Sequence, residues 1–198
     1  MTDADWGRRF DPERLAGLEL AMWKAYYRRQ GARLFALLVR ANHEQAAIGW
    51  VGALRAAFYL ARAAVRFGKS TDDYSRFEPD IARGYRALKL PSDVDSAEVA
   101  RRELRWWVVR REIGLAAGEA AGAAITALYA GLYGVEEERV AEAGRLRGLA
   151  AEVRDRGAAA DLDGPTGAGR AYWPEVGRLL RDSYQSLHAA LERAGSQA

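Results

Sequence analysis

Residues 95–107, DSAEVARRELRWW, repeat the pattern of residues 11–23, DPERLAGLELAMW. Each stretch opens with an aspartate, a residue that caps the free N–H groups at a helix start, and the first one continues with a proline, which fits the first helical position. The stretches share five identical positions: Asp11/Asp95, Ala16/Ala100, Glu19/Glu103, Leu20/Leu104 and Trp23/Trp107. The pattern predicts two related helices.

Apolar residues at helical spacing extend over the rest of the chain, and no segment alternates with the period of two that strands require. We therefore expect an all-α bundle of about six helices, forming a single helical domain over residues 1–198. The expected helices cover 11–45, 46–67, 79–90, 95–132, 136–156 and 174–194. A glycine-rich flexible linker is expected over 157–170.

Further matches continue the similarity between the two halves. Residues 77–83, FEPDIAR, align with residues 172–178, YWPEVGR, and the offset between matched positions grows along the chain. Loop insertions after a duplication would produce matches in this order. We therefore predict an internal duplication of a three-helix unit, with half-repeats over about 11–92 and 93–194.

A resemblance to other proteins rests on AEVARRELRWW at 97–107, on the small-residue segment that ends at Leu132-Tyr133-Gly134, and on WPEVGRLLRDSYQSL at 173–187. These stretches resemble a group of uncharacterised proteins of GC-rich bacteria. The resemblance covers roughly residues 95–191. It implies a helical domain and brings no activity, ligand or site residue.

The composition excludes several classes of function. Hydrophobic residues make up 49% and charged residues 29% of the chain, which is typical of a protein with a packed core. The net charge of +3 is spread along the sequence with acids near most arginines, so we expect no nucleic-acid partner. Cysteine is absent, which excludes disulfides, thiolate metal sites and a cysteine nucleophile.

The segment 113–134 is apolar enough to be considered as a membrane span. It is built from alanine and glycine rather than leucine, and Glu119 interrupts it, so a buried helix is the better interpretation. We therefore expect no membrane partner. The acidic start, Met1 to Asp5, precedes no apolar run and is not a signal peptide, which favours a cytoplasmic location.

Four glutamates have apolar neighbours three and four positions away on both sides: Glu19, Glu103, Glu112 and Glu119. A buried carboxylate must be paired, protonated or bound to a cation. Three interpretations stay open. The glutamates pair with arginine or tyrosine from neighbouring helices, they form a carboxylate metal site, or they hold the polar group of a ligand against Trp23, Trp106 or Trp107.

The candidate ligand-binding residues are Glu19, Trp23, Tyr26, Glu103, Trp107, Glu112 and Glu119. We expect Glu19 and Glu103 to be largely buried, on equivalent helices that pack together, and Glu112 and Glu119 to share one side of the helix 95–132. The metal interpretation is weak, because di-iron bundles use Glu-x-x-His motifs and His43 and His188 stand in none. No metal ligand and no cofactor are predicted.

Gly114, Gly118 and Gly122 recur every four residues within this expected helix. Glycine weakens a helix by about 1 kcal/mol relative to alanine, so the repeat predicts close packing against another helix. We expect leucine or phenylalanine side chains to lie over these glycines.

These observations predict a non-catalytic, soluble helical protein that binds or interacts with a partner, works as a homodimer and has a possible small-molecule ligand. The alternative is a helical-bundle enzyme or metal protein with a carboxylate-lined site that uses Glu19 and Glu103.

Overall fold

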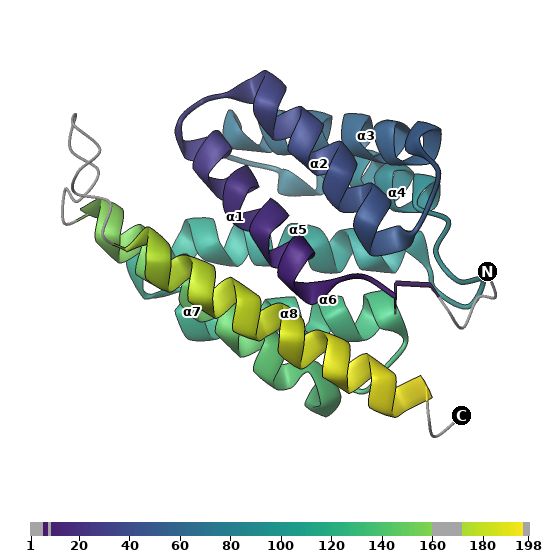
Figure 1. Ribbon diagram of the computed structural model, residues 1–198. Helices are drawn as coiled ribbons and strands as arrows, with labels where there is room; N and C mark the ends of the chain where they lie inside the picture. The colour runs from purple at the N-terminus through teal and green to yellow at the C-terminus, as the bar shows by residue number, and fades with distance from the viewer. Residues whose placement is uncertain (1–5, 8, 160–171, 196–198) are drawn as a thin grey trace.

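The chain folds into a bundle of α-helices (Figure 1), and the contacts between successive helices and between the first and the last form a closed ring. The computed structural model describes residues 6–7, 9–159 and 172–195. Its helices are α1 (Pro12–Tyr27), α2 (Gly31–Ala46), α3 (Trp50–Gly68), α4 (Glu78–Ala87), α5 (Ser96–Ile113), α6 (Gly118–Tyr133), α7 (Glu137–Ala159) and α8 (Trp173–Gly195). Two short 3-10 turns cover Tyr74–Phe77 and Gly114–Ala116. No strand occurs within the described residues, and the all-α prediction is confirmed.

Two of the expected helices are each a pair of helices, so eight helices replace the expected six in the described part of the chain. The expected helix over 11–45 ends at Tyr27, where Arg29 adopts a positive φ of 56° and reverses the chain into α2. The expected helix over 95–132 breaks at Gly114, with a φ of 69°. A straight helix over 11–45 would be about 50 Å long, too long to keep its apolar face on a compact core.

Each helix packs on its neighbours in sequence, and α8 closes the ring against α1. The half-repeats therefore correspond to four helices each, α1–α4 and α5–α8, and the three-helix unit was wrong. A duplicated four-helix unit would give matching contacts in the two halves, and the duplication itself stays a prediction.

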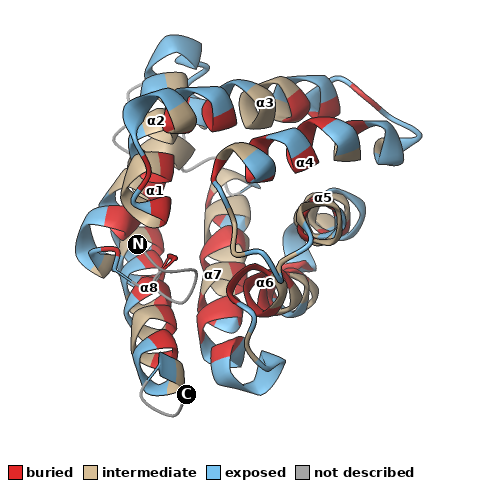
Figure 2. Ribbon diagram, turned by 90° about the vertical axis from the view of Figure 1, so that its right-hand side faces the viewer, coloured by how far each residue is buried: buried red, intermediate tan, exposed pale blue. Residues whose placement is uncertain are grey.

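The core lies where the inner faces of the helices meet (Figure 2). Its fully buried side chains include Leu15 of α1, Ile81 of α4, Ile125 of α6 and Leu180 of α8. These residues stand at the apolar positions of their helices and come from both halves of the chain. One core therefore joins the two halves.

Helices α6 and α7 approach closely through glycine. A Cβ atom on Gly148 of α7 would lie 2.3 Å from the carbonyl oxygen of Gly118, and one on Gly122 would lie 3.1 Å from the Cα of Arg145. The predicted close contact at Gly118 and Gly122 is therefore present, but α7 backbone and Glu152 cover them rather than leucine or phenylalanine. Gly114 does not belong to this contact, because it ends α5 in open space.

The remaining helix predictions differ from the structure by a few residues at their ends. The expected linker begins too early, because α7 continues to Ala159, and the rest of the linker lies outside the described residues. The expected buried helix at 113–134 corresponds to α6. None of the helices in the described residues is long and apolar enough to cross a membrane.

Candidate functional site

An internal cavity of about 130 Å³ lies at the centre of the ring. Glu19 of α1, Glu103 of α5 and Arg147 of α7 line it, together with Asn42 of α2 and Tyr129 of α6. Two carboxylates and one guanidinium group therefore meet in the core, contributed by three helices that the sequence keeps far apart.

Glu19 is the most buried charged residue of this group, with 1% of its surface exposed. Arg147 donates to its Oε1 from Nε at 2.8 Å and from Nη2 at 2.7 Å, and the Tyr184 hydroxyl donates to its Oε2. Burial alone would lower the pKa of Arg147, but Glu19 and the other acidic groups around it, Tyr129, Tyr184 and Glu103, together outweigh this effect and raise the pKa. Glu19 and Arg147 therefore form an ion pair, and the Tyr184 hydroxyl donates a further hydrogen bond to Glu19.

Glu103 is partly buried and has a different set of donors. The Tyr85 hydroxyl donates to its Oε2 at 2.9 Å, and the Trp107 Nε1 donates to its Oε1 at 2.9 Å. Burial raises the pKa of Glu103, although the charge of Arg147 and these hydrogen bonds oppose the shift. Glu103 is thus protonated more readily than an ordinary glutamate.

The raised pKa predicts a pH dependence of stability. An unfolded glutamate titrates near its ordinary value of 4.5, so above that pH the unfolded chain has released a proton that the folded chain still holds. Folding stability from this group therefore falls as the pH rises from the ordinary value through the raised one. The glutamine in Glu103→Gln does not titrate. As the pH rises through this window, the free energy of unfolding of the wild type should therefore fall relative to that of the variant.

Urea denaturation midpoints between about pH 4 and pH 8 measure this difference. Parallel curves for the two proteins would contradict the assignment of a raised pKa to Glu103.

Two polar atoms of the cavity residues, Asn42 Nδ2 and the Tyr129 hydroxyl, are buried and lack a hydrogen bond of normal geometry. Burial raises the pKa of Tyr129 to about 12, so its hydroxyl keeps its proton and can donate. Such a cavity suits ordered water or a very small polar guest. It is smaller than the roughly 300–1,000 Å³ that drug-sized ligands occupy.

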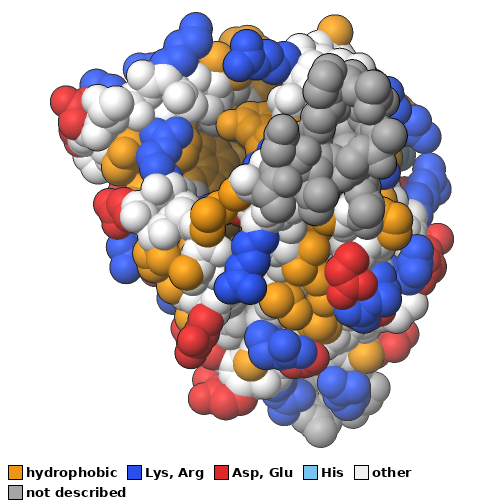
Figure 3. All heavy atoms as spheres, turned by 90° about the vertical axis from the view of Figure 1, so that its left-hand side faces the viewer, with side chains coloured by type: hydrophobic (Ala, Val, Ile, Leu, Met, Phe, Trp, Pro, Cys, Tyr) orange, Lys and Arg blue, Asp and Glu red, His pale blue; other side chains and the backbone are white. Residues whose placement is uncertain are grey.

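A larger site opens on the surface where the C-terminal parts of α1, α3, α5 and α7 meet. Figure 3 views this side of the molecule, where hydrophobic side chains line a hollow. We call this site the aromatic cleft, a space of about 400 Å³. Its lining residues are Trp23, Tyr26, Tyr27, Ala64, Phe67, Trp106, Trp107, Arg110, Arg111 and Asp155.

Arg110 is held rigidly in the cleft. It donates to Asp155 from Nε at 3.0 Å and from Nη2 at 2.7 Å, and Nη2 also donates to the Tyr27 hydroxyl at 2.5 Å. This two-point geometry fixes the plane of the guanidinium group. Its carbon lies 5.7 Å from the centre of the Trp23 ring, so the charge also faces an aromatic wall.

Arg111 is fixed by backbone rather than by a carboxylate. Its Nη1 donates to the carbonyl oxygens of Phe67 at 2.9 Å and Ser70 at 2.7 Å, where α3 ends. Carbonyl groups at a helix C-terminus lack helical partners and attract a cation. Its guanidinium also stacks 3.9 Å from the centre of the Phe67 ring. The cleft therefore holds two arginines against one aspartate.

The cavity and the cleft share a wall made of tryptophan. Trp107 lines the cleft, while its Nε1 donates a hydrogen bond to Glu103 in the core. Trp106 also lines the cleft, and Arg147 lies 5.3 Å from the centre of its ring. The charged core groups therefore support the back of the aromatic surface and set the orientation of at least one of its rings.

Five of the predicted site residues lie in the cleft or in the cavity. Trp23, Tyr26 and Trp107 line the aromatic cleft, whereas Glu19 and Glu103 line the cavity behind it. Helix α1 makes its main contacts with α2 and α8, and α5 with α4 and α6. The two glutamates therefore share a cavity although their helices are not main packing partners, which corrects the expectation of direct packing.

Glu112 and Glu119 are exposed, and their prediction as buried residues of one helix face was wrong. The break at Gly114 places them on different helices, α5 and α6. The apolar neighbours of the two glutamates therefore do not lie on one continuous helix face.

Several residues of the site were not predicted: Tyr85, Arg147 and Tyr184 in the core, and Phe67 and Asp155 in the cleft. Arg147 carried a usable signal, because the small residues Ala143, Gly144, Ala150 and Ala151 surround it at helical spacing. The sequence suggested arginines only as general partners of the glutamates, whereas Arg110 and Arg111 lie in the cleft. Tyr85 and Tyr184 carried no local signal.

The two histidines have structural contacts. The His43 ring stacks on Trp50 with 4.0 Å between ring centres, and the His188 ring packs edge-on against Phe10. In the described ranges, no group of three histidine, aspartate or glutamate side chains is arranged to hold a metal ion.

Comparisons of this chain with protein-family models, curated proteins and solved structures gave no match. The resemblance of residues 95–191 to uncharacterised bacterial proteins stays a prediction. The chemistry of the cleft and the cavity is therefore the basis for a functional proposal.

Proposed function

We propose that the protein is a non-catalytic binding protein that takes up a small, planar aromatic molecule with one acidic group in the aromatic cleft. The observation that carries this proposal is the composition of the cleft. Six aromatic side chains and two arginines surround a space of about 400 Å³ and face a single aspartate.

The aromatic side chains favour a flat ligand. Aromatic rings attract one another in offset or edge-on arrangements worth about 0.5–1.5 kcal/mol beyond the burial of their area. The indole of Trp107 has its orientation set by Glu103, and the phenol of Tyr27 by Arg110. A ligand ring entering the cleft therefore meets surfaces that are already oriented and that lose little freedom on binding.

The charges of the cleft favour an acidic group on that ligand. Asp155 offsets only one of the two guanidinium groups, because Arg111 is held by backbone carbonyls that carry no formal charge. A single carboxylate or sulfonate would balance the one net positive charge of the residues that line the cleft.

Binding is a better interpretation than catalysis because of how the acidic groups are used. Asp155 is the one carboxylate that lines the cleft among the described residues, and it is engaged by Arg110 and Arg154. Glu19 and Glu103 lie behind the tryptophan wall, each with its own donors. None of these carboxylates is placed as a free base beside a ligand.

The test uses the fluorescent probe 8-anilinonaphthalene-1-sulfonate, which carries flat aromatic rings and a single negative charge. We expect saturable binding that quenches tryptophan fluorescence. Tyr26→Ala should raise the Kd by roughly threefold to tenfold through the loss of one aromatic contact. The matched control is Phe58→Ala on α3, because Tyr26 and Phe58 are 54% and 52% exposed.

Equal weakening by the two substitutions would assign the probe to exposed apolar surface in general and overturn the proposal. Circular dichroism of both variants verifies that the helices are retained. The homodimer and the cytoplasmic location expected from the sequence stay predictions.

A further inference from the structure

Helix α3 exposes a row of large apolar side chains. Eight large hydrophobic residues are exposed in the described part of the chain, and five of them lie on α3: Trp50, Val51, Leu54, Phe58 and Val65. Val51 is the most exposed of the five, at 83%. We call these five residues the apolar row.

The row is one face of the helix rather than a scatter of positions. At 100° per residue, its members fall within an arc of about 100°, on the side opposite the buried alanines Ala53, Ala56 and Ala63. Figure 2 shows α3 along the top edge of the molecule with α4 beneath it. The apolar row therefore lies at an outer edge of the molecule, and exposed apolar groups concentrated in this way mark an interaction surface.

Arginines follow the row on the side that faces α4. The next positions around α3 are Arg55, Arg62 and Arg66, and α4 adds Arg83 and Arg86. We call these five residues the arginine row. Arg55, Arg83 and Arg86 line a surface hollow of about 360 Å³ together with Tyr59.

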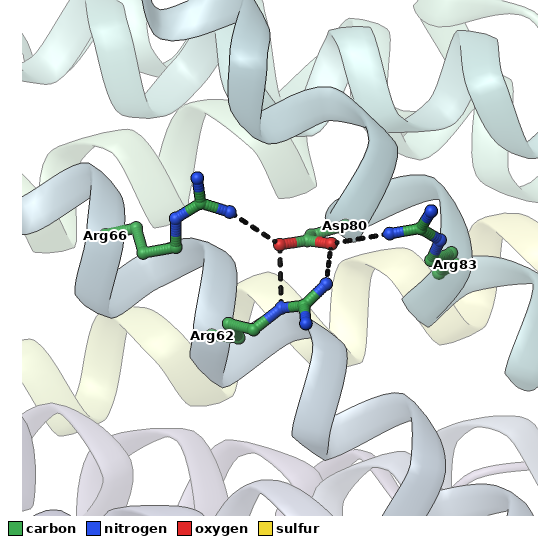
Figure 4. A network of polar contacts seen from close by, with 4 residues as sticks. All are labelled: Arg62, Arg66, Asp80 and Arg83. Carbon is green, nitrogen blue, oxygen red and sulfur yellow. Dashed lines mark hydrogen bonds and ion pairs between the residues drawn. The ribbon is translucent and has the colours of Figure 1, made fainter.

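Asp80 of α4 pairs with three residues of the arginine row, as Figure 4 shows. Asp80 accepts from Arg62 Nε at 2.9 Å, from Arg66 Nη1 at 3.2 Å and from Arg83 Nη1 at 3.1 Å. The 19 residues of α3 contain no aspartate or glutamate. The face therefore carries a large excess of positive charge directly beside exposed apolar side chains.

We propose that this face docks on the surface of a bilayer that contains anionic phospholipids. The apolar row enters the boundary between headgroups and acyl chains, as the apolar faces of interfacial helices do. The arginine row meets the lipid phosphates, and the hollow of Arg55, Arg83 and Arg86 receives one of them. This proposal departs from the expectation of no membrane partner, which considered only a segment that could span.

A second copy of the chain fits this face less well. In a symmetric contact through α3, the helix of the copy would offer the arginine row no opposite charge, because α3 has no acidic residue. An antiparallel pair of α3 helices related by a two-fold axis would place both arginine rows on the same side of the contact, where they repel. A bilayer, in contrast, offers phosphates to the arginine row and acyl chains to the apolar row.

The test is sedimentation of the full chain with vesicles of phosphatidylcholine alone and of phosphatidylcholine with one quarter phosphatidylglycerol. We expect binding to the anionic vesicles that weakens as salt rises, and little binding to the neutral ones. The double variant Val51→Glu/Phe58→Glu should lower the partition by roughly tenfold or more. Its control, Ile113→Glu/Leu115→Glu, adds the same charge at residues that are 48% and 50% exposed on another face.

A second pair of variants tests the charge. Arg55→Gln/Arg86→Gln should also lower the partition by roughly tenfold, while Arg105→Gln/Arg193→Gln, at exposed positions on α5 and α8, should change it much less. Absence of binding to anionic vesicles at low salt would overturn the proposal. Equal loss of vesicle binding in a variant pair and in its control would also overturn it. The same holds if the wild type does not bind vesicles but forms a dimer in solution that Val51→Glu/Phe58→Glu abolishes. None of these results depends on probe binding in the aromatic cleft.

Discussion

Replacing Arg147 with methionine is expected to lower the free energy of unfolding by about 3–5 kcal/mol. Methionine keeps much of the length of the side chain but removes both donors to Glu19, which is 1% exposed. The carboxylate would then be left in the core with the Tyr184 hydroxyl as its remaining partner. Urea denaturation of wild type and variant measures the loss.

Arg145 provides the matched control, since it stands two positions away on the same helix and is exposed. It pairs with Glu142 at 2.7 Å on the surface, so Arg145→Met should change stability by less than about 0.5 kcal/mol. The double variant Glu19→Gln/Arg147→Met should recover part of the loss, because no bare charge remains. Equal small effects of Arg147→Met and Arg145→Met would show that the pair contributes nothing to the core.

Replacing Gly148 with alanine is expected to lower the free energy of unfolding by about 2–3 kcal/mol. The new Cβ would lie 2.3 Å from the carbonyl oxygen of Gly118 and 2.5 Å from the backbone nitrogen of Gly122. Both neighbours are backbone atoms of α6, so the clash is relieved only by moving one helix away from the other. That movement costs packing along the whole α6–α7 contact.

Gly17 of α1 supplies the control for this substitution. A Cβ on Gly17 meets nothing within 4 Å, so Gly17→Ala should raise stability by about 0.5–1 kcal/mol through helix propensity. The same chemical change should therefore have opposite signs at two helical positions, which thermal or urea unfolding resolves. A stabilising Gly148→Ala would mean that α6 and α7 are not in backbone contact.

Local signals in the sequence were enough for the fold class and for several helix starts. Asp11 accepts from the backbone N–H of Glu13 at 2.9 Å, and Asp95 accepts from that of Ala97 at 2.8 Å, as the capping pattern predicts. Burial of Glu19 could also be predicted, because its apolar neighbours lie on its own helix. Each of these properties depends on residues within one or two helical turns, so the local sequence is enough to predict it.

The helix breaks after Tyr27 and Ile113 were not predicted, although Gly114 is a residue type that commonly ends helices. Neither break contains a proline, and Arg29 with its positive φ has no local preference for that conformation. The turns exist because α1 and α5 must each reverse against the core. The same failure explains the wrong placement of Glu112 and Glu119, whose shared face required a continuous helix.

The site itself was decided by the tertiary structure. Sequence alone determined an all-α chain with capped helices, a buried glutamate, and Trp23, Tyr26 and Trp107 as candidate binding residues. Only the closed ring brought Arg147 and Tyr184 to Glu19, across 128 and 165 positions of sequence, and gathered the arginines of α3 and α4 around Asp80. Burial follows the period of a single helix, whereas a charged partnership depends on which helices become neighbours, and that follows from packing the whole core.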